Sequence, residues 1–252
     1  MTWQTVDWQK KIQTLYNKLL LSLGQCDLCG NNLNNCILPQ QTLVCSSCFA
    51  DLPLFKQAIV QGDLLNWPSI NKALPNINFD HLVSLSPYLP PFTQWLPQLK
   101  YQGRFELASL LSTLLAQLFT QESFEKYALP FDLMLSVPLH PRKWQIRGFN
   151  QAHLLAKPLA HHLQIPYDRT ALARVKNNNS QVGQSGKQRR NNLVDAFMLV
   201  KALPRNTKHV LLVDDVLTTG STTNEISKIL KRADVRTVTV ATICLSLPET
   251  KN

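Results

Sequence analysis

Residues 210–225, with the sequence VLLVDDVLTTGSTTNE, constrain the fold of this chain more than any other stretch. Four apolar residues at the start of the segment are typical of a short buried strand in a parallel sheet. Two carboxylates, Asp214 and Asp215, follow that strand directly. After a small, hydroxyl-rich loop, the spacing Thr222-x-x-Glu225 predicts a capping box at the start of a helix. The segment therefore predicts a strand, a tight loop and a helix in immediate succession.

The loop in this segment has the chemistry of a phosphate-binding site. The first turn of a helix presents unpaired N–H groups and the positive end of the helix dipole, which suit a phosphate. Gly220 lets the backbone approach an anion closely, and further donors are the hydroxyls of Thr218, Thr219, Ser221 and Thr222. The twin carboxylates can accept hydrogen bonds from two neighbouring sugar hydroxyls. The pattern therefore favours a sugar phosphate over an ordinary solvated turn, and the absence of G-x-x-x-x-G-K-[ST] argues against a P-loop NTPase.

Five of the six cysteines fall between positions 26 and 48. Two C-x-x-C pairs, Cys26 with Cys29 and Cys45 with Cys48, have the spacing of a four-thiolate zinc site. Disulfides are the alternative, but they require an oxidising compartment that nothing in the sequence indicates. Zinc is therefore favoured, in a structural role because four cysteines close its coordination sphere. Cys36 is either an ordinary loop cysteine or an alternative ligand.

Two basic stretches precede predicted helices. In the first, LKYQGR, Lys100 and Arg104 flank a glycine turn, so they are either ligands of an anion or solvated loop residues. In the second, a predicted strand over residues 131–139 ends in the basic loop HPRKWQIRGFN before another helix, which suits pyrophosphate. Pro158 is expected to kink or shorten that helix.

Residues 174–192, RVKNNNSQVGQSGKQRRNN, form the most polar stretch of the chain. Its cationic residues are Arg174, Lys176, Lys187, Arg189 and Arg190. The stretch is either a surface loop or a lid that closes over an anionic substrate and excludes water. Its place beside a predicted phosphate site favours the lid.

The order of the elements predicts an α/β fold. From residue 81 onward, predicted strands and helices alternate, which indicates a parallel sheet with helices on both faces and ligands at the carboxyl ends of the strands. We expect two domains: residues 1–76, with an amphipathic helix over 5–23, the zinc-binding module and a connector, and residues 77–252, with the sheet.

The charge balance favours anionic ligands. The chain has 26 basic and 16 acidic residues, a net charge of +10, which produces a field that attracts nucleotides, pyrophosphate or nucleic acid. A hydrophobic content of 44% with 17% charged residues is typical of a globular protein. The N-terminus lacks the apolar core of a signal peptide, and no run of 18 apolar residues occurs, so we expect a cytoplasmic chain without a membrane span.

These motifs resemble those of a known family. The run DDVLTTGST resembles the phosphoribosyl pyrophosphate (PRPP) signature of type I phosphoribosyltransferases. Nearly the whole chain resembles the ComF family (competence protein F, also called GntX-like), through the four-cysteine module, LKYQGR, VPLHPRKWQIRGFNQA, the polar loop with RRNN, and DDVLTTGST. The resemblance implies a type I phosphoribosyltransferase-like fold, a small N-terminal zinc module and an association with the uptake of transforming DNA. Cys36 departs from the plain four-cysteine pattern.

The resemblance also implies roles for individual residues. Asp214 and Asp215 would hold the ribose 2- and 3-hydroxyls, and the 5-phosphate would bind to Thr218, Thr219, Gly220, Ser221 and Thr222. The pyrophosphate side would comprise His140, Arg142, Lys143 and Arg147, with Lys100 and Arg104 nearby. Lid residues would be Lys187, Arg189 and Arg190, which with the two acids form the predicted catalytic set. Magnesium would bridge the pyrophosphate and the ribose hydroxyls, mostly through water and substrate oxygens.

Two functions of different classes remain open at this level. One is an enzyme that transfers phosphoribosyl from PRPP to an unidentified acceptor while pyrophosphate departs. The other is a non-catalytic protein that senses PRPP or handles single-stranded DNA on its basic face, alone or with the DNA-uptake machinery. Aromatic residues among the bases, Tyr101, Trp144 and Phe149, are suggestive of stacking on bases.

Overall fold

The computed structural model describes residues 24–33, 43–120, 130–175 and 196–246. The predicted helix over residues 5–23, Cys36 and the predicted lid residues Lys187, Arg189 and Arg190 lie outside these ranges. The chain divides into two compact units, Met1–Pro53 and Leu54–Asn252. The first contains helix α2 (Ser46–Ala50).

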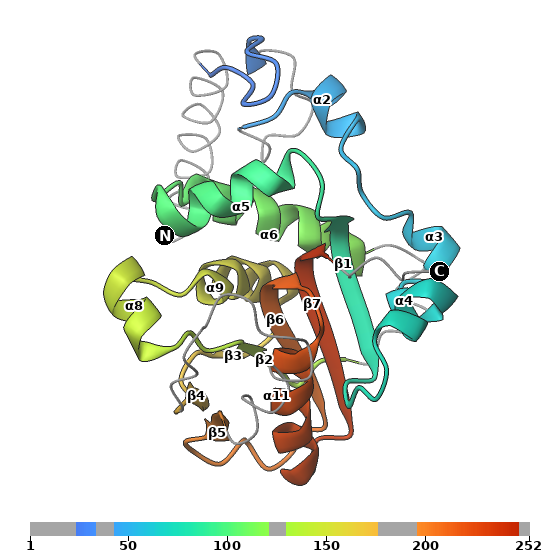
Figure 1. Cartoon of the computed structure of the whole chain (residues 1–252), viewed down its shortest axis with the longest axis vertical. Coiled ribbons are helices and arrows are strands. Elements are labelled where there is room, and N and C mark those ends of the chain that lie inside the picture. The colour runs from blue at the N-terminus through green and yellow to red at the C-terminus, as the bar shows by residue number, and fades with distance from the viewer. Residues whose placement is uncertain (1–23, 34–42, 121–129, 176–195, 247–252) are drawn as a thin grey trace, which may run out of the picture. The chain divides into compact units, whose positions relative to one another are not determined.

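The second unit is built on a five-stranded parallel sheet flanked by helices (Figure 1). Its strands, in spatial order, are β1 (His81–Pro87), β7 (Thr237–Leu245), β6 (His209–Leu217), β2 (Leu133–Ser136) and β3 (Tyr167–Asp168). Strand β6 is therefore central, and Leu212 lies level with Leu135 on one side and Val240 on the other. The expected parallel α/β fold is confirmed.

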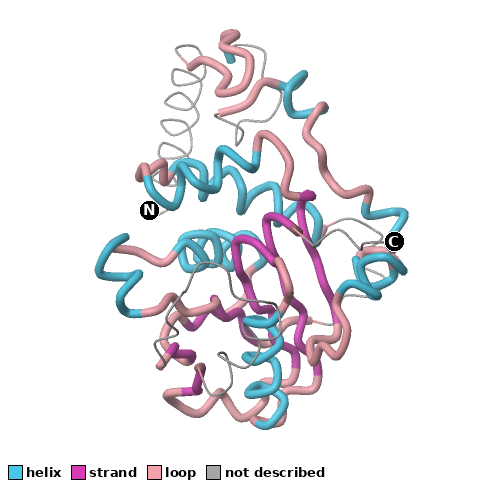
Figure 2. The backbone as a smooth tube through the Cα atoms, in the orientation of Figure 1, coloured by secondary structure: helices cyan, strands magenta, loops and turns pink. Residues whose placement is uncertain are grey.

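After strand β1, the described part of the second unit contains five helices. They are α5 (Phe92–Tyr101), α6 (Glu106–Phe119), α8 (Pro141–Arg147), α9 (Gln151–Leu163) and α11 (Ser221–Arg232). Helices α6 and α9 pack against each other and contact the sheet. A separate antiparallel pair, β4 (Leu172–Arg174) with β5 (Phe197–Leu199), lies beside α11, as the backbone trace in Figure 2 shows. Among the described helices, none has both the length and the apolarity that crossing a bilayer requires.

The segment before β1 belongs to the second unit. It holds α3 (Gln57–Val60), η2 (Leu64–Asn66) and α4 (Pro68–Ala73). The sequence placed this segment with the N-terminal domain, as a connector. In the structure Val60, Leu64, Ile70 and Leu74 are buried in the same core cluster as the apolar side chains of β6 and β7. That burial of apolar area ties the segment to the sheet.

Three local expectations differ from the structure. Strand β6 runs on through both acids to Leu217, because its ladder with β7 continues to that residue. Helix α11 has no side-chain cap: Gly220 is its N-cap, and Glu225, the expected capping-box partner, pairs with Lys228 at 2.7 Å. Helix α9 continues through Pro158 to Leu163. The burial of Leu155 and Leu159, on either side of that proline, holds the helical backbone in place.

Candidate functional site

The two acids of the central strand form the heart of the candidate site. Asp214 and Asp215 lie close to the carboxyl end of β6, the edge at which parallel sheets bind ligands. The Asp214 Oδ1 atom accepts a hydrogen bond from the Asp215 N–H at 2.9 Å, and Asp215 Oδ1 accepts one from the Val216 N–H at 2.8 Å. These short local bonds fix both carboxyl groups.

A lysine from α5 neutralises one of the acids. The Lys100 Nζ atom lies 2.5 Å from Asp215 Oδ2, and the two side chains are 22% and 13% exposed. Burial alone would lower the pKa of Lys100, but the nearby charges of Asp215 and Asp214 outweigh it and raise that pKa. Lys100 is thus a charged group held beside Asp214 and Asp215.

The surroundings of Asp214 disfavour its negative charge. Its pKa is raised, first because burial disfavours the charged carboxylate and then because the Asp215 charge lies next to it. Because the negative charge on Asp214 is unfavourable, a hydrogen-bond donor that approaches this carboxylate would stabilise it. Sugar hydroxyls or a hydrated cation would supply such donors.

The hydroxyl-rich loop encloses a small hollow. The hollow has a volume of about 50 Å³ and is lined by Asp214 and by the backbone and side chains of residues 216–223. Gly220 has φ +68°, a conformation that side chains other than glycine rarely adopt, and a Cβ atom there would lie in tight contact, 3.3 Å, with Leu74 Cδ2. The Thr219 and Ser221 hydroxyls hydrogen-bond each other at 2.8 Å. The loop therefore presents clustered donors at the start of α11, as phosphate binding requires.

The predicted pyrophosphate side comes from α8, and its residues differ in position. His140 Nδ1 accepts a hydrogen bond from the Arg142 N–H at 3.1 Å, so this buried imidazole caps α8. Arg147 lies over the Tyr101 ring at 4.7 Å and donates to its hydroxyl at 2.7 Å. Lys143 has a lowered pKa, first from burial and then from the charges of Arg147, Arg174 and Lys100. These effects place Lys143 and Arg147 in one cationic group with Lys100.

Arg104 is engaged away from this group. Its Nε atom pairs with Glu106 at 2.7 Å, and its Nη1 atom donates to Gln98 Oε1 at 2.8 Å. It therefore ties the end of α5 to the start of α6. Its role as an anion ligand stays a prediction that this geometry does not favour.

The N-terminal thiols converge on one point. The sulfur atoms of Cys26, Cys29, Cys45 and Cys48 all lie within 4.8 Å of one another, with Cys29 and Cys45 3.7 Å apart. A tetrahedral zinc ion with Zn–S bonds of about 2.3 Å places its sulfurs roughly 3.8 Å apart. None of the described cysteines is in a disulfide. The cluster can hold a metal ion, as the cysteine spacing predicts.

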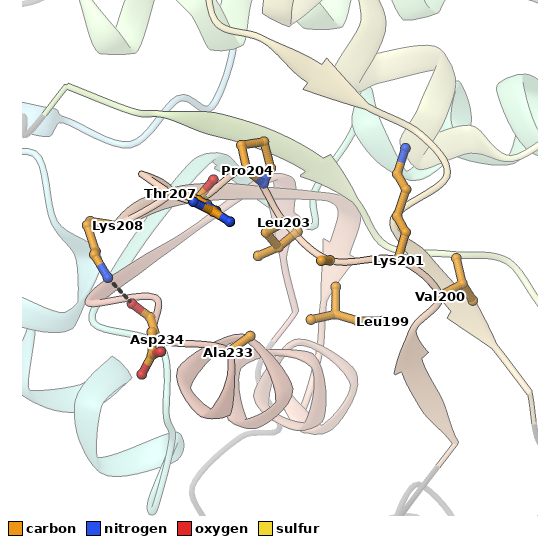
Figure 3. A pocket seen from close by; sticks show the side chains of 11 residues that line it. Leu199, Val200, Lys201, Leu203, Pro204, Thr207, Lys208, Ala233 and Asp234 are labelled. Carbon is orange, nitrogen blue, oxygen red and sulfur yellow. Dashed lines mark hydrogen bonds between the residues drawn. The ribbon is translucent and has the colours of Figure 1, made fainter.

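A larger hollow of about 560 Å³ lies at the far end of α11 (Figure 3). It is lined by residues 199–205, Thr207, Lys208, Ala233 and Asp234. Two of its cations are already engaged, Lys201 with Asp168 at 2.7 Å and Lys208 with the Asp234 carbonyl at 3.2 Å. This hollow is the larger of the two, but it lacks the paired acids and the hydroxyl-rich loop. We therefore take the opposite end of α11 as the candidate functional site.

Comparison with known proteins agrees with this geometry. The phosphoribosyl transferase domain model matches residues 150–252. The DNA utilization protein YhgH of Salmonella typhi is 36% identical over 227 residues, 89% of this chain and 91% of that protein. Competence protein F of Haemophilus influenzae is 38% identical over 168 residues, 65% of this chain and 72% of that protein.

Solved structures resemble only part of this chain, and weakly. The glutamine PRPP amidotransferase of B. subtilis, complexed with ADP and GMP, is 22% identical with a TM-score of 0.34, and covers 52% of this chain. This chain spans only a quarter, 25%, of that enzyme's chain. The likeness is too low to support a functional comparison.

Proposed function

We propose, since this chain belongs to the family of the DNA utilization protein YhgH and competence protein F and carries a phosphoribosyl transferase domain, that it binds PRPP and transfers its phosphoribosyl group to an acceptor. The observation that carries the proposal is that two adjacent acids near the carboxyl end of β6 lie beside the hydroxyl-rich loop of residues 218–222. Carboxylates suited to vicinal hydroxyls and a helix start suited to phosphate lie within one continuous segment.

Each side chain then has a defined task. Asp214 and Asp215 accept the ribose hydroxyls, and the loop donates to the 5-phosphate. Lys100, released from Asp215 as the ribose hydroxyls arrive, joins Lys143 and Arg147 in stabilising the departing pyrophosphate. Positive charge builds up on the anomeric carbon as that bond breaks, so catalysis rests on positioning and on leaving-group stabilisation.

The acidic residues fit a magnesium ion held mainly by the substrate. Asp215 is already paired with Lys100, and burial disfavours the charge on Asp214, so the protein offers the ion few free oxygens. Such a site suits Mg²⁺, which keeps several waters and binds substrate phosphates. When bound, the ion would offset the negative charge of the pyrophosphate.

PRPP with magnesium is expected to raise the melting temperature of the purified protein. A ligand at 100 times its Kd stabilises the folded state by about 2.7 kcal/mol, which corresponds to roughly 5–10 °C for a domain of this size. Differential scanning fluorimetry measures the shift, and pyrophosphate release is then followed while candidate acceptors are scanned. A melting temperature unchanged by millimolar PRPP would contradict the proposal.

A second candidate function, the handling of single-stranded DNA, is favoured by one surface. Tyr101, Phe105 and Trp144 are 66%, 50% and 50% exposed, and the Arg147 guanidinium already stacks on Tyr101. Exposed aromatic faces among cations are what single-stranded DNA requires. We call these four residues the aromatic–basic surface.

Trp144→Ala is expected to lower the affinity for a single-stranded oligonucleotide about tenfold, since stacking contributes roughly 1–3 kcal/mol per base. The slope of affinity against salt should stay nearly unchanged, because no phosphate contact is removed. Arg142→Ala should flatten that slope instead. Fluorescence anisotropy at several salt concentrations measures both.

The matched control is Trp67→Ala, which removes another partly exposed tryptophan, one that packs edge-on against Phe55. It should leave DNA binding unchanged. If wild-type protein binds no single-stranded DNA at low salt, the aromatic–basic surface has no such role.

A further inference from the structure

A connection outside the predicted site, residues 74–80 between α4 and β1, lies along the helix that follows the hydroxyl-rich loop. We call it the α4–β1 loop. Near the carboxyl end of α11, the Lys231 Nζ atom lies 2.6 Å from Asp80 Oδ2. In the first turn of α11, Asn224 makes hydrogen bonds to the same loop. Positions seven apart share one face of a helix. The α4–β1 loop therefore runs beside one face of α11.

A single side-chain amide makes the polar contacts at the start of α11. The Asn224 Oδ1 atom accepts hydrogen bonds from the Asn78 N–H at 2.6 Å and from the Asn78 Nδ2–H at 2.8 Å. The Asn224 Nδ2–H donates to the carbonyl oxygen of Asn76 at 3.4 Å. Asn76 has φ +59°, a left-handed conformation that asparagine adopts more readily than most residues. Asn224 therefore fixes the turn of the α4–β1 loop against the first turn of the helix.

Apolar contacts join the same two segments at the end of the hydroxyl-rich loop. A Cβ atom at Gly220 would lie 3.3 Å from Leu74 Cδ2 and 3.7 Å from Phe79 Cε1. Leu74 and Phe79 are both buried. The Asn224 N–H donates to the Gly220 carbonyl oxygen at 2.8 Å, so the polar and apolar contacts meet within one helical turn. The α4–β1 loop thus holds both the glycine that ends the hydroxyl-rich loop and the helix turn after it.

These contacts replace a local device that is absent from the start of α11. The N-cap residue, Gly220, makes no side-chain hydrogen bond to the first turn. A serine, threonine or aspartate at this position usually provides that bond and fixes the helix start. Donors that are already in place bind a ligand more tightly than donors that must first be ordered. Contacts from the α4–β1 loop therefore decide how well the phosphate donors are arranged before a ligand arrives.

We propose that Asn224 is a positioning residue for the 5-phosphate of the ligand. It acts through the α4–β1 loop, whose packing on Gly220 keeps the N–H and hydroxyl donors of residues 218–222 in their binding arrangement. This assignment rests on the proposed PRPP function and names the contacts that prepare its phosphate loop. Because the ligand and the α4–β1 loop favour the same arrangement of donors, each stabilises the contacts of the other.

The test compares Asn224→Ala with wild type by isothermal titration calorimetry, using ribose 5-phosphate and, separately, pyrophosphate with Mg²⁺. Asn224→Ala should raise the Kd for ribose 5-phosphate about tenfold, because the ligand must then order the loop itself. Pyrophosphate, which does not use this loop, should bind both proteins within about twofold. A general loss of folded protein would instead weaken both ligands equally. Asn78→Ala keeps the backbone hydrogen bond to Asn224 Oδ1 and should lose less affinity for ribose 5-phosphate.

Hydrogen exchange gives a second measurement. Ribose 5-phosphate should slow the exchange of the Asn78 amide in wild type, because its N–H is bonded to Asn224 Oδ1 and the ligand stabilises that contact. In Asn224→Ala the same amide should exchange rapidly with or without the ligand.

Asn66→Ala is the matched control. It also removes a side-chain hydrogen bond before β1, from Asn66 Nδ2 to the Val60 carbonyl oxygen at 3.0 Å, but outside the α4–β1 loop. It should bind ribose 5-phosphate as wild type does. If Asn224→Ala binds ribose 5-phosphate within twofold of wild type, Asn224 has only a structural role and this proposal is overturned. An equal loss for pyrophosphate would also overturn it. Absence of both PRPP and ribose 5-phosphate binding by wild type would instead remove the proposed function and this assignment with it.

Discussion

Reduced, freshly purified protein is expected to contain about one zinc ion per chain, and Cys45→Ser is expected to lose it. Four thiolates within 4.8 Å of one another match the closed coordination of structural zinc. The binding free energy of such a site is also folding free energy for the segment that forms it. Cys45 contributes twice, because its sulfur also accepts the N–H of Cys48 at the start of α2. Elemental analysis measures the metal content.

The expected damage is confined to the N-terminal unit. Limited proteolysis should cut within Met1–Pro53 much faster in Cys45→Ser than in wild type, while the PRPP-induced rise in melting temperature persists, because the second unit has its own core. Cys36→Ser is the matched control and should retain zinc if four ligands suffice. Wild-type protein devoid of metal under reducing conditions would refute the zinc assignment.

Asp215→Asn is expected to raise the Kd for PRPP about 10- to 100-fold, the range for losing a hydrogen bond to a charged group. The substitution replaces a charged acceptor for a ribose hydroxyl with a neutral amide of the same shape. It also leaves the Lys100 ammonium without its partner at 2.5 Å, in a position that is only 22% exposed. Calorimetric titration with PRPP and Mg²⁺ measures the loss.

The two contributions can be separated. In the double variant Asp215→Asn, Lys100→Met the unpaired charge is gone, so any stability lost through it should return, whereas the weak binding of PRPP should remain. Asp234→Asn, at the opposite end of α11, is the control: its backbone has φ +64°, which asparagine tolerates. Equal PRPP affinity in wild type and Asp215→Asn would show that the acid does not hold the ribose.

The predicted capping box shows where a local sequence rule gave the wrong detail. The spacing Thr222-x-x-Glu225 suits a capping box, but the chain reaches α11 through Gly220 with a positive φ, packed against Leu74. The helix therefore starts after Gly220, and Glu225 pairs with Lys228 instead of closing a capping box. His140 Nδ1 caps the helix that follows it, and the role of this residue in anion binding stays a prediction.

The sequence alone determined those structural features that depend on a few consecutive residues. The apolar run, the twin acids and the hydroxyl loop of residues 210–222 predict a strand end with a phosphate-binding turn, because neighbours along the chain dictate hydrophobic period and turn chemistry. The cysteine spacing predicts a metal site for the same reason, and alternation of strands and helices predicts the parallel sheet.

Only the tertiary structure decided which distant charges meet. Lys100 pairs with Asp215 from 115 positions away. Arg104, equally basic and four residues from Lys100, is engaged by Glu106 and Gln98 instead. A charge pattern in sequence gives no direction to a side chain; strand order and helix packing set that direction, and with it the electrostatics of the site.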